Sequence, residues 1–454
     1  MTFSEKIFKA YDIRGLVKGE LSSDFAYKLG VSFVQFLRNK EFSLENKKIV
    51  IAYDMRPSSL DYKEKLLEAI NDQGIDVLDI GRATTPMFNF ACANYGENVA
   101  GIMVTASHNP GQYNGFKLSL GDGLPVAEKN GLVEIKKMCQ NFNFEKKEKK
   151  GEIFKKSILE DYKKKVFSLV NKDNFKKLKI VIDAGNGMAK VSLPEILKDL
   201  DLEIEYLFLE PDGNFPNHEA NPLKSETLKT LQEKVIANKA DFGFALDGDA
   251  DRVGLVDENG QIVPASFVGA IIGLEILKKE KGLMLYDLRM SRSVKEMWEK
   301  AGATTDICPV GHSNIKKIMK ENNAIFASEL SLHLYYHDMY DVESSDLSLL
   351  YIIELLSRKN KKLSEIWEKM GEGKYHSGEI NFEVENKEKV FAEIKSKYSD
   401  GELSELDGIL ITYDNFWFSV RASNTEPVIR LNLEADSEEL MEEKVREISE
   451  IIKK

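Results

Sequence analysis

The sequence predicts a four-domain protein, with three α/β domains followed by a smaller α+β domain. The chain has 454 residues, which is more than one hydrophobic core usually supports. Through about the first 370 residues, short apolar runs alternate with amphipathic stretches, as in doubly wound α/β layers. Residues 407–435 instead predict a β-meander with a hairpin near Asp414 and Asn415, followed by a C-terminal helix, which indicates an α+β unit.

Each apolar run of the α/β part reads as a buried strand that ends in a polar loop. The clearest runs are 47–54, 99–106, 178–185, 240–248, 282–288 and 323–330. Between them lie helical patterns such as 61–74, with apolar residues three and four apart and Gly74 as a stop. Functional loops in such folds lie at the carboxyl ends of the strands.

Three shifts in composition indicate the domain boundaries. They are a charge-rich connector at 141–156, a turn cluster at 257–264 and a Gly-rich polar segment at 371–380. The predicted domains are 1–150, 151–256, 257–371 and 372–454.

Composition limits the partners and the compartment. The formal net charge of −12 argues against nucleic acid or an anionic membrane as the main partner. The start of the chain lacks the apolar core of a signal peptide, and the apolar stretch 263–277 is too short and broken to span a bilayer, so we expect a buried helix there. Cys92, Cys139 and Cys308 are far apart, which predicts reduced thiols in a cytoplasm.

The loop LDGDADRVG at 246–254 places Asp247, Asp249 and Asp251 at alternate positions. In an extended loop, this spacing can point three carboxylates at one centre, and an all-oxygen set suits Mg²⁺. The alternative is a solvated acidic turn. An EF-hand is excluded, because its sixth position must be Gly, whereas this chain has Arg252 there. Arg252 would instead orient a phosphoryl oxygen or pair with a carboxylate.

The segment VTASHNPGQYNGFK at 104–117 puts the hydroxyl of Ser107 beside the imidazole of His108, with Lys117 a few residues on. Asn-Pro and the glycines keep the segment irregular. It is either an ordinary polar turn or a loop in which Ser107 does chemistry.

The segment VRASNTEP at 420–427 offers one guanidinium, several short polar side chains and successive backbone N–H groups. This inventory matches a phosphate dianion, although a structural turn is the simpler interpretation of the segment alone. The residues concerned are Arg421, Ser423, Asn424 and Thr425.

The segment SELSLHLYY at 328–336 places Glu329, Ser331 and His333 at alternate positions, as an extended loop would if all three faced one cavity. A carboxylate and a hydroxyl there could contact vicinal sugar hydroxyls. Ordinary polar alternation at a strand edge is the alternative.

Several single residues are less informative taken alone. His312 precedes an apparent helix start, and a lone histidine is more often structural than catalytic. Arg14 and Arg289 are isolated arginines, and in an acidic protein such residues usually form ion pairs with carboxylates at the surface. His218 lies in a Pro/Asn-rich loop that we expect to close an interdomain surface.

Together and in this order, the segments resemble the α-D-phosphohexomutase superfamily, and within it the phosphomannomutase/phosphoglucomutase group. The matching motifs cover essentially the whole chain and are KAYDIRG, TASHNP, DAGNG, PDGNFPNH, DGDADR, GHSNIKK, SELSLH and RASNTEP. The resemblance implies three α/β domains with mixed sheets and a C-terminal α+β domain around a central cleft.

The resemblance also implies a reaction. A phosphoryl group would move reversibly between C1 and C6 of a hexose phosphate, either mannose or glucose, through a phosphoserine and a hexose 1,6-bisphosphate that also acts as activator. Ser107 would carry the phosphoryl group. The implied Mg²⁺ ligands are Ser107, Asp247, Asp249 and Asp251.

Roles in substrate binding and proton transfer follow from the same resemblance. The non-reacting phosphate would be held by Arg421, Ser423, Asn424 and Thr425, and the sugar 3- and 4-hydroxyls by Glu329 and Ser331. Further substrate contacts would come from Tyr11, Arg252 and Arg289. The residues implied in catalysis beside Ser107 are Arg14, His108, Lys117, His312 and His333, with the general base left open among Lys117, His312 and His333.

Two departures from the family pattern concern the shape of the sugar loop and the choice of proton donor. Ser328 and Leu332 stand where the group usually has glycines, and Leu332 adds bulk where backbone would approach the ligand. Arg289 stands where the nearest pattern has Lys, and the two are not equivalent as proton donors.

Other functions remain as alternatives. Phosphoglucosamine mutase differs mainly in the sugar loop. At the position of Leu330, mannose and glucose enzymes have Met and glucosamine enzymes have Gln, and Leu resembles the Met more closely. A serine hydrolase of the alkaline phosphatase type needs clustered histidines, and a non-catalytic sugar-phosphate-binding protein is the remote alternative. We expect a small-molecule substrate, no nucleic acid or membrane partner, and a monomer or weak homo-oligomer.

Overall fold

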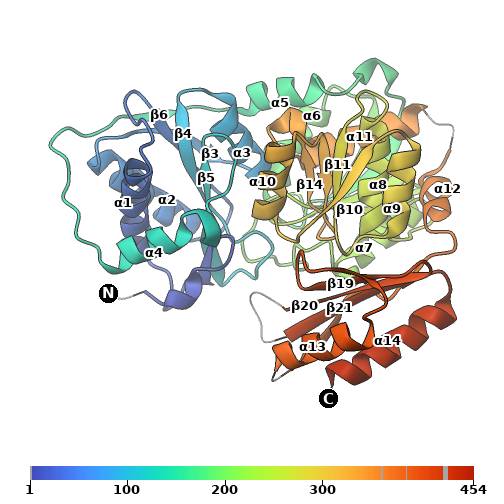
Figure 1. Cartoon of the computed structure of the whole chain (residues 1–454). Helices are drawn as coiled ribbons and strands as arrows, with labels where there is room; N and C mark the ends of the chain where they lie inside the picture. The colour runs from blue at the N-terminus through green and yellow to red at the C-terminus, as the bar shows by residue number, and fades with distance from the viewer. Residues whose placement is uncertain (1–2, 359–360, 385, 423–427, 454) are drawn as a thin grey trace.

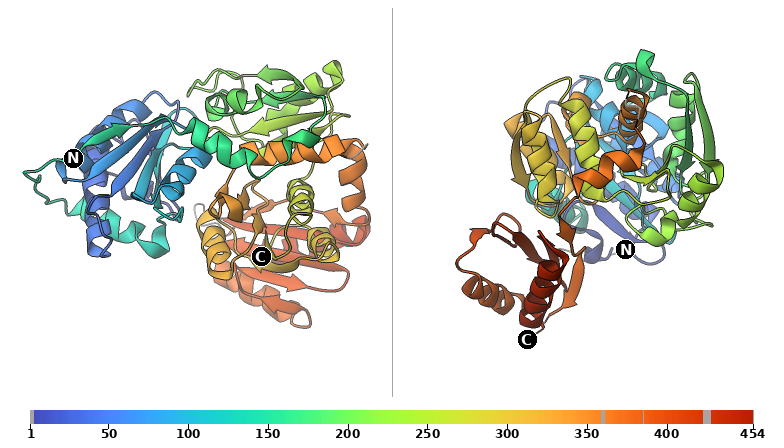
Figure 2. Two further views of the ribbon diagram at one scale, coloured as in Figure 1. Left: turned by 90° about the horizontal axis from the view of Figure 1, so that it is seen from above. Right: turned by 90° about the vertical axis from the view of Figure 1, so that its right-hand side faces the viewer.

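The computed structural model describes residues 3–358, 361–384, 386–422 and 428–453. Strands in these ranges form four sheets that follow one another along the chain (Figure 1). The parts that hold the first three sheets lie side by side, and the C-terminal part is set apart from them (Figure 2). Across these ranges, no helix is both long and apolar enough to cross a membrane.

The first sheet is mixed and has the strand order β1-β5-β4-β2-β3-β6. Its strands are β1 (Ile13–Leu16), β2 (Lys48–Tyr53), β3 (Asp76–Arg82), β4 (Asn98–Val104), β5 (Tyr113–Leu120) and β6 (Ile153–Lys155). Its helices are α1 (Ser23–Asn39), α2 (Ser59–Asp72), α3 (Thr85–Asn94) and α4 (Leu132–Gln140). Strand β2 is apolar on both faces, because Ile49 and Ile51 pack with α1 and α2 while Val50 and Ala52 pack with α3.

Strand β6 lies just beyond residue 150, where the sequence predicts a domain boundary. It pairs in parallel with β3 through Val77↔Ile153 and Asp79↔Lys155, so the first sheet continues beyond that residue. All three residues of β6 are exposed and lysines surround them. The strand therefore lacks the apolar periodicity that marks buried strands.

The second and third sheets are also mixed, with strand orders β10-β9-β7-β8 and β12-β11-β13-β14-β15. The second part contains β7 (Leu178–Asp183), β8 (Leu202–Leu207), β9 (Phe242–Leu246), β10 (Val253–Asp257), α5 (Leu159–Phe167), α6 (Leu193–Leu197) and α7 (Lys229–Asn238). The third contains β11 (Leu283–Asp287), β12 (Thr304–Cys308), β13 (Phe326–Ser328), β14 (Leu334–Tyr336), β15 (Val342–Glu343), α8 (Ala265–Ile276), α9 (Arg292–Lys300), α10 (His312–Asn322), α11 (Ser345–Arg358) and α12 (Leu363–Trp367).

The fourth sheet is antiparallel and has α13 and α14 on one face. Its elements are β16 (Tyr375–His376), β17 (Ile380–Glu383), β18 (Glu402–Ser404), β19 (Ile409–Thr412), β20 (Phe416–Ala422), β21 (Val428–Ala435), α13 (Lys387–Lys397) and α14 (Glu438–Ile452). Short 3₁₀ turns along the chain are η1 (Glu5–Ile7), η2 (Glu128–Asn130), η3 (Lys172–Asn174), η4 (Met188–Val191), η5 (Ser225–Leu228), η6 (His337–Met339) and η7 (Glu368–Met370).

The predicted fold class is confirmed: three mixed α/β units precede an α+β unit. Each of the six predicted strands is present, and the predicted helix at 61–74 is α2, with Gly74 at a φ of +74° just beyond its end. The stretch 263–277 forms α8, whose residues are buried almost throughout.

One continuous apolar core runs through the first three parts, and the fourth has its own. Phe88 of α3, Phe244 of β9 and Trp298 of α9 are fully buried members of the shared core. Helices α13 and α14 instead cover a separate core around Phe418. Between the third and fourth parts lies a small apolar cluster of Leu288, Leu410 and Trp417.

His218 joins its loop to the end of β7 in the second part. Its Nε2 lies 3.0 Å from Asp183 Oδ2, and its Nδ1 lies 2.8 Å from the carbonyl oxygen of Glu219. Burial lowers the pKa of His218, but the bond to Asp183 and that carboxylate's charge outweigh burial and raise the pKa above its ordinary value. The protonated form is therefore the one that the fold favours.

We expect His218 to stabilise the protein more at low pH. Because its pKa is raised on folding, its contribution is complete below about pH 6.5, the ordinary histidine value, and is lost as the pH rises through the folded pKa. Urea unfolding of the wild type and of His218→Gln at about pH 5.5 and about pH 8.5 measures this. An equal difference in unfolding free energy at both pH values would contradict the prediction.

Candidate active site

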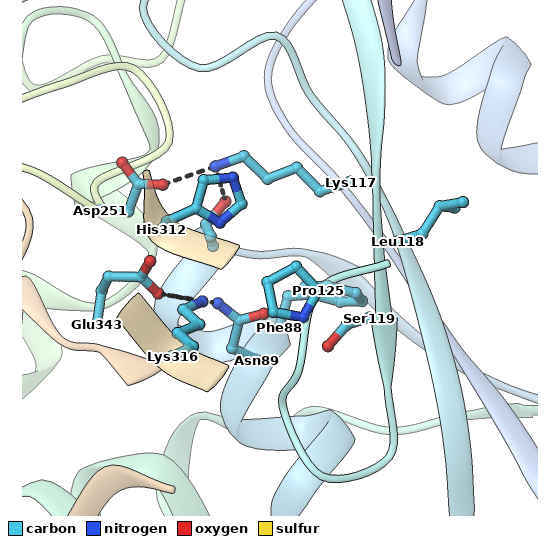
Figure 3. Close-up of a pocket in the computed structure, with 11 residues that line it drawn as sticks. Phe88, Asn89, Lys117, Leu118, Ser119, Pro125, Asp251, His312, Lys316 and Glu343 are labelled. Atoms are coloured by element: carbon cyan, nitrogen blue, oxygen red, sulfur yellow. Dashed lines mark hydrogen bonds and ion pairs between the residues drawn. The ribbon is translucent and has the colours of Figure 1, made fainter. Parts of the chain in front are cut away.

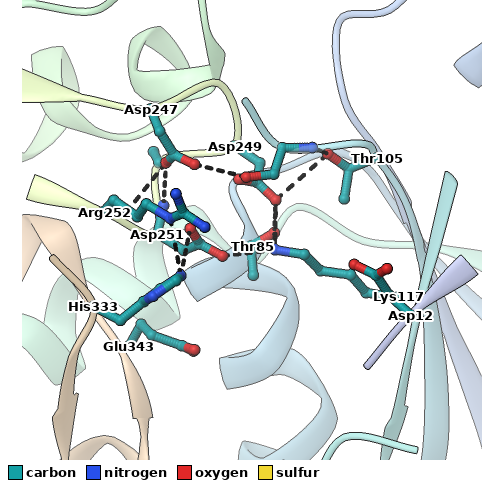
Figure 4. A network of polar contacts seen from close by, with 12 residues as sticks. Asp12, Thr85, Thr105, Lys117, Asp247, Asp249, Asp251, Arg252, His333 and Glu343 are labelled. Carbon is teal, nitrogen blue, oxygen red and sulfur yellow. Dashed lines mark hydrogen bonds and ion pairs between the residues drawn. The ribbon is translucent and has the colours of Figure 1, made fainter. Parts of the chain in front are cut away.

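Loops from the first three sheets converge at the carboxyl ends of their strands, as expected for α/β layers. The loop after β4 carries Ser107, the β9–β10 hairpin loop carries the three aspartates, and the turn between β13 and β14 leads to His333. Figure 4 shows the resulting network of polar contacts.

Ser107 occupies a constrained position at the end of β4. It is 2 % exposed, and its φ of +50° lies in the left-handed region, which a non-glycine residue keeps only where its surroundings hold it. Its Oγ donates to Asp247 Oδ2 at 2.7 Å and lies 3.1 Å from Nδ1 of His108. Burial and the charge of Arg252 lower the pKa of His108 well below its ordinary value.

Arg56 holds the Ser107 loop in place, a role that sequence reasoning missed. Its guanidinium donates to the carbonyl oxygens of Ser107 and Tyr113, both at 2.8 Å, and further to those of Asn109 and Pro110. Arg56 lies in the loop that begins after Tyr53, the last residue of β2, so its place near a strand's carboxyl end was the available signal. Gly248 lets the aspartate loop at 246–254 approach the Ser107 loop, because a Cβ there would lie 2.4 Å from the carbonyl oxygen of Ser107.

The three aspartates are gathered in one buried cluster. Asp247 and Asp249 are 0 % exposed and Asp251 is 4 % exposed, with one carboxylate oxygen of each within 4.8 Å of the others. The loop is a compact turn rather than extended: Asp247 Oδ1 accepts from the backbone N–H of Asp251 at 3.0 Å, and Ala250 has a φ of +59°.

Lys117 of β5 pairs with two of these carboxylates. Its Nζ lies 2.7 Å from Asp249 Oδ2 and 2.6 Å from Asp251 Oδ2. Burial lowers the pKa of Lys117, but Asp249 and Asp251 raise it far more, so the net shift is upward. Thr85 of α3, which sequence reasoning missed, donates to Asp249 Oδ2 at 2.7 Å.

The aspartate cluster fits a hard divalent cation. Burial, followed by the charges of Asp251 and Asp249, raises the pKa of Asp247 well above its ordinary value. The shift reflects the unfavourable free energy of holding three negative charges close together in a buried site. Asp249 Oδ1 is buried and accepts no hydrogen bond from the residues that the structure describes. A metal ion would relieve both features with the all-oxygen ligands that Mg²⁺ prefers.

Glu329, Ser331 and His333 do meet, but through a turn and not the extended loop expected. The N–H of Leu332 donates to the carbonyl oxygen of Glu329 at 2.9 Å, and Leu332 has a φ of +70°. The Leu332 side chain is buried in the shared apolar core, so its bulk does not lie where the ligand was expected. Ser331 Oγ lies 2.7 Å from His333 Nδ1.

His333 links the sugar turn to the aspartates. Its Nε2 lies 3.3 Å from Asp251 Oδ1, and its Nδ1 lies 3.4 Å from Glu329 Oε2. Burial opposes protonation, but the charge of Asp251 and the hydrogen bonds to Asp251 and Glu329 together outweigh burial and Arg252 and raise the pKa of His333 to about 9. Arg252 Nε lies 3.3 Å from His333 Nε2.

His312 and Tyr11 lie next to His333. The rings of His312 and His333 are 6.5 Å apart, and those of Tyr11 and His312 are 5.5 Å apart. His312 opens α10 after Gly311, which has a φ of +110° and where a Cβ would collide with Tyr11. Burial and Lys316 lower the pKa of His312 well below its ordinary value.

Behind His312, a small cavity of about 20 Å³ separates Lys117 from a buried ion pair (Figure 3). Lys316 Nζ lies 2.7 Å from Glu343 Oε2, and Asn89 of α3 donates to the same oxygen at 3.2 Å. The ion pair thus ties the first sheet's helix α3 to α10 and β15 of the third part.

The two remaining arginines of the cleft are bound by carboxylates. Arg289 donates to Asp287 through Nε at 3.1 Å and Nη2 at 2.6 Å, and its Nη2 lies 3.6 Å from Glu329. Arg14 donates through Nε to Asp12 Oδ2 at 2.8 Å and through Nη1 to Asn109 Oδ1 at 2.7 Å. Arg289 therefore supports Glu329 from behind, and Arg14 supports the Ser107 loop.

Arg421 lies at the end of β20, in the fourth sheet. Its Nε donates to Asp407 Oδ2 at 3.0 Å, and the side chain is largely buried. Within the part of the chain that the structure describes, no hydrogen bond or ion pair joins Arg421 directly to another predicted site residue. Ser423, Asn424 and Thr425 lie outside the described residues.

Comparisons with known proteins agree with this architecture. Sequence models of the phosphoglucomutase/phosphomannomutase family match nearly the whole chain: alpha/beta/alpha domain I at 5–146, domain II at 157–260, domain III at 265–372 and the C-terminal domain at 379–451. The chain belongs to this family. It is therefore a phosphohexomutase, an isomerase of hexose phosphates.

Members of the phosphoglucomutase/phosphomannomutase family match along their full length. A phosphomannomutase of Methanocaldococcus jannaschii is 40% identical over 453 residues, which are 99% of this chain and 98% of the relative. A phosphomannomutase of Vibrio cholerae is 36% identical over 98% of each chain. The crystal structure of a family protein from Burkholderia thailandensis superposes with a TM-score of 0.90 at 29% identity, covering 100% of this chain and 98% of that one.

Proposed function

We propose that this phosphohexomutase interconverts the 1- and 6-phosphates of mannose and of glucose through a phosphoserine at Ser107 and a hexose 1,6-bisphosphate. The observation that carries the proposal is the position of the Ser107 hydroxyl, which lies 2.7 Å from Asp247 within a buried cluster of three aspartates. The curated relatives named phosphomannomutase support the choice of mannose.

In the first half-reaction, phospho-Ser107 gives its phosphoryl group to the free hydroxyl of the hexose phosphate. Mg²⁺ bound by Asp247, Asp249, Asp251 and an oxygen of the phosphoserine would supply Lewis-acid stabilisation of the transferring group. Lys117 contacts two of the aspartates and is placed to share in that stabilisation. Phosphoryl transfer depends mainly on such positioning and charge.

The proton of the attacking hydroxyl needs an acceptor. We assign this role to His312, because burial and Lys316 lower its pKa well below the ordinary value and keep the imidazole neutral. Lys117 and His333 contact the aspartates directly, and we assign them to charge stabilisation.

The second half-reaction returns the other phosphoryl group to Ser107 after the bisphosphate has turned over in the cleft. Arg421, with Ser423, Asn424 and Thr425, would grip whichever phosphate is not reacting. Glu329 and Ser331 would contact the sugar hydroxyls, together with Tyr11, Arg252 and Arg289 at the cleft. Both half-reactions would then use the same phosphate-binding residues around Arg421 and the same transfer site at Ser107.

The proposal also includes a cellular compartment and an activator. Cys92, Cys139 and Cys308 are buried free thiols, which supports the cytoplasm as the location. A hexose 1,6-bisphosphate is the activator that would load Ser107.

Steady-state kinetics with three substrates test this function. We expect kcat/KM for mannose 1-phosphate and glucose 1-phosphate to exceed that for glucosamine 1-phosphate by roughly tenfold or more, because the site must discriminate at a polar substituent. A preference for glucosamine 1-phosphate would make the chain a phosphoglucosamine mutase. Release of inorganic phosphate at the turnover rate would indicate a hydrolase, and binding without conversion would indicate a sugar-phosphate-binding protein.

A further inference from the structure

Asp407 lies where the fourth part of the chain meets the third. It sits in the connection between β18 and β19, beside a cleft of about 980 Å³ that Tyr11 and Pro309 also line. A single oxygen, Oδ2, accepts two hydrogen bonds: from Arg421 Nε at 3.0 Å and from the backbone N–H of Val310 at 3.0 Å. The Asp407 side chain is 23% exposed, and that of Arg421 is 6% exposed.

The bond to Asp407 uses one part of the Arg421 guanidinium. Arginine has five N–H donors in a planar fork, and the four on the terminal nitrogens take no part in a bond made through Nε. A carboxylate at Nε therefore fixes the plane of the fork while its terminal nitrogens remain the donors suited to a phosphate.

The other partner of Asp407 belongs to a turn that reaches the sugar end of the site. The next N–H along, that of Gly311, donates to Glu329 Oε1 at 3.2 Å, and His312 follows as the first residue of α10. Tyr11 of the first part donates through its hydroxyl to the carbonyl oxygen of Val310 at 3.3 Å. Two successive amides thus join a carboxylate beside Arg421 to a carboxylate of the sugar turn.

We propose that Asp407 is a positioning residue: it orients Arg421 for the substrate's non-reacting phosphate and sets the distance between that guanidinium and the turn at 309–311. The inference rests on the proposed function, in which Arg421 holds that phosphate. Asp407 itself does not touch the substrate. It acts through Arg421, so its effect should vanish when Arg421 is absent.

Substitution of Asp407 tests this through the split between KM and kcat. Asp407→Asn keeps the shape of the side chain but removes the negative charge that lies beside the Arg421 guanidinium. We expect KM for mannose 1-phosphate to rise roughly 10- to 100-fold, the effect of losing a hydrogen bond to a charged group. We expect kcat to change by less than about threefold, because the phosphate grip is used equally in the ground and transition states.

A double-mutant cycle separates positioning from a merely structural role. Arg421→Gln should raise KM, and adding Asp407→Asn to it should cause no further rise. The matched control is Glu405→Gln, an acidic residue of the same connection that pairs with Lys395 of α13 and should leave KM unchanged. Thermal unfolding of every variant reports folding.

Each result of the cycle is decisive. An unchanged KM in Asp407→Asn, beside a raised KM in Arg421→Gln, would overturn the positioning role alone. An equal further rise in the double variant would also overturn it, because Asp407 would then act without Arg421. An unchanged KM in Arg421→Gln would instead overturn the role of Arg421 in the proposed function.

Discussion

Ser107→Ala is expected to lower kcat for mannose 1-phosphate by roughly 10⁴-fold or more, because it removes the oxygen that would carry the phosphoryl group in the proposed mechanism. The protein should still fold, because the substitution removes one hydroxyl and Arg56 still binds the loop through backbone carbonyl oxygens. Incubation with a hexose 1,6-bisphosphate, followed by intact-protein mass spectrometry, should show one phosphoryl group on the wild type and none on the variant.

Ser119→Ala is the matched control for this prediction. Ser119 is a buried serine of β5, two residues from Lys117, and its hydroxyl donates to the carbonyl oxygen of Leu120 at 3.2 Å. Its variant should keep kcat and the phosphoryl group. Full mutase activity in Ser107→Ala would refute the phosphoserine mechanism.

Asp249→Asn is expected to lower kcat by about 10³-fold and to raise the Mg²⁺ concentration for half-maximal activity by at least roughly 100-fold. A bound metal supplies several kcal/mol of charge stabilisation, and loss of one carboxylate from three weakens its hold. Chelation of the wild type with EDTA should reproduce the loss of activity, and added Mg²⁺ should restore it. Titration of each protein with Mg²⁺ in the mutase assay measures both effects.

Asp241→Asn is the control for metal binding. Asp241 precedes β9, at the opposite end of the strand from the aspartate loop at 246–254. It accepts from the backbone N–H of Lys179 at 2.7 Å. Its variant should keep the Mg²⁺ dependence of the wild type. If Asp249→Asn also kept that dependence, the aspartate cluster would not be the metal site.

Regular features of this fold were predictable because they repeat in the sequence. The apolar runs of β2, β4 and β9 are buried on both faces, and such strands are continuous in the sequence. The three aspartates could be found because they lie within five residues of one another. Ser107 stood out through its irregular surroundings, although its left-handed backbone did not.

Features that depend on distant pairing were not predictable. Arg56 and Thr85 act on loops that lie far from them in sequence. The position of Arg56 after a strand marks it as a candidate, but nothing next to either residue indicates its partner. The compact shape of the 329–332 turn depends on Leu332, whose apolar contacts in the core are long-range. Asp407 likewise acquires its role only when the fourth part packs on the third.

The continuous apolar core makes the first three parts of the chain more rigid relative to one another than the fourth part is relative to them. Moving Ser107 away from the aspartates would open an apolar interior that extends from α3 to α9, whereas moving Arg421 would separate only a small apolar cluster and a few polar bonds. The conformational entropy that would be lost in enclosing a hexose phosphate is therefore concentrated in the C-terminal part, from β16 to α14. In the proposed mechanism, the bisphosphate would therefore turn over against a fixed Ser107 and aspartate cluster, while the C-terminal part that carries Arg421 would move to release and rebind its phosphate.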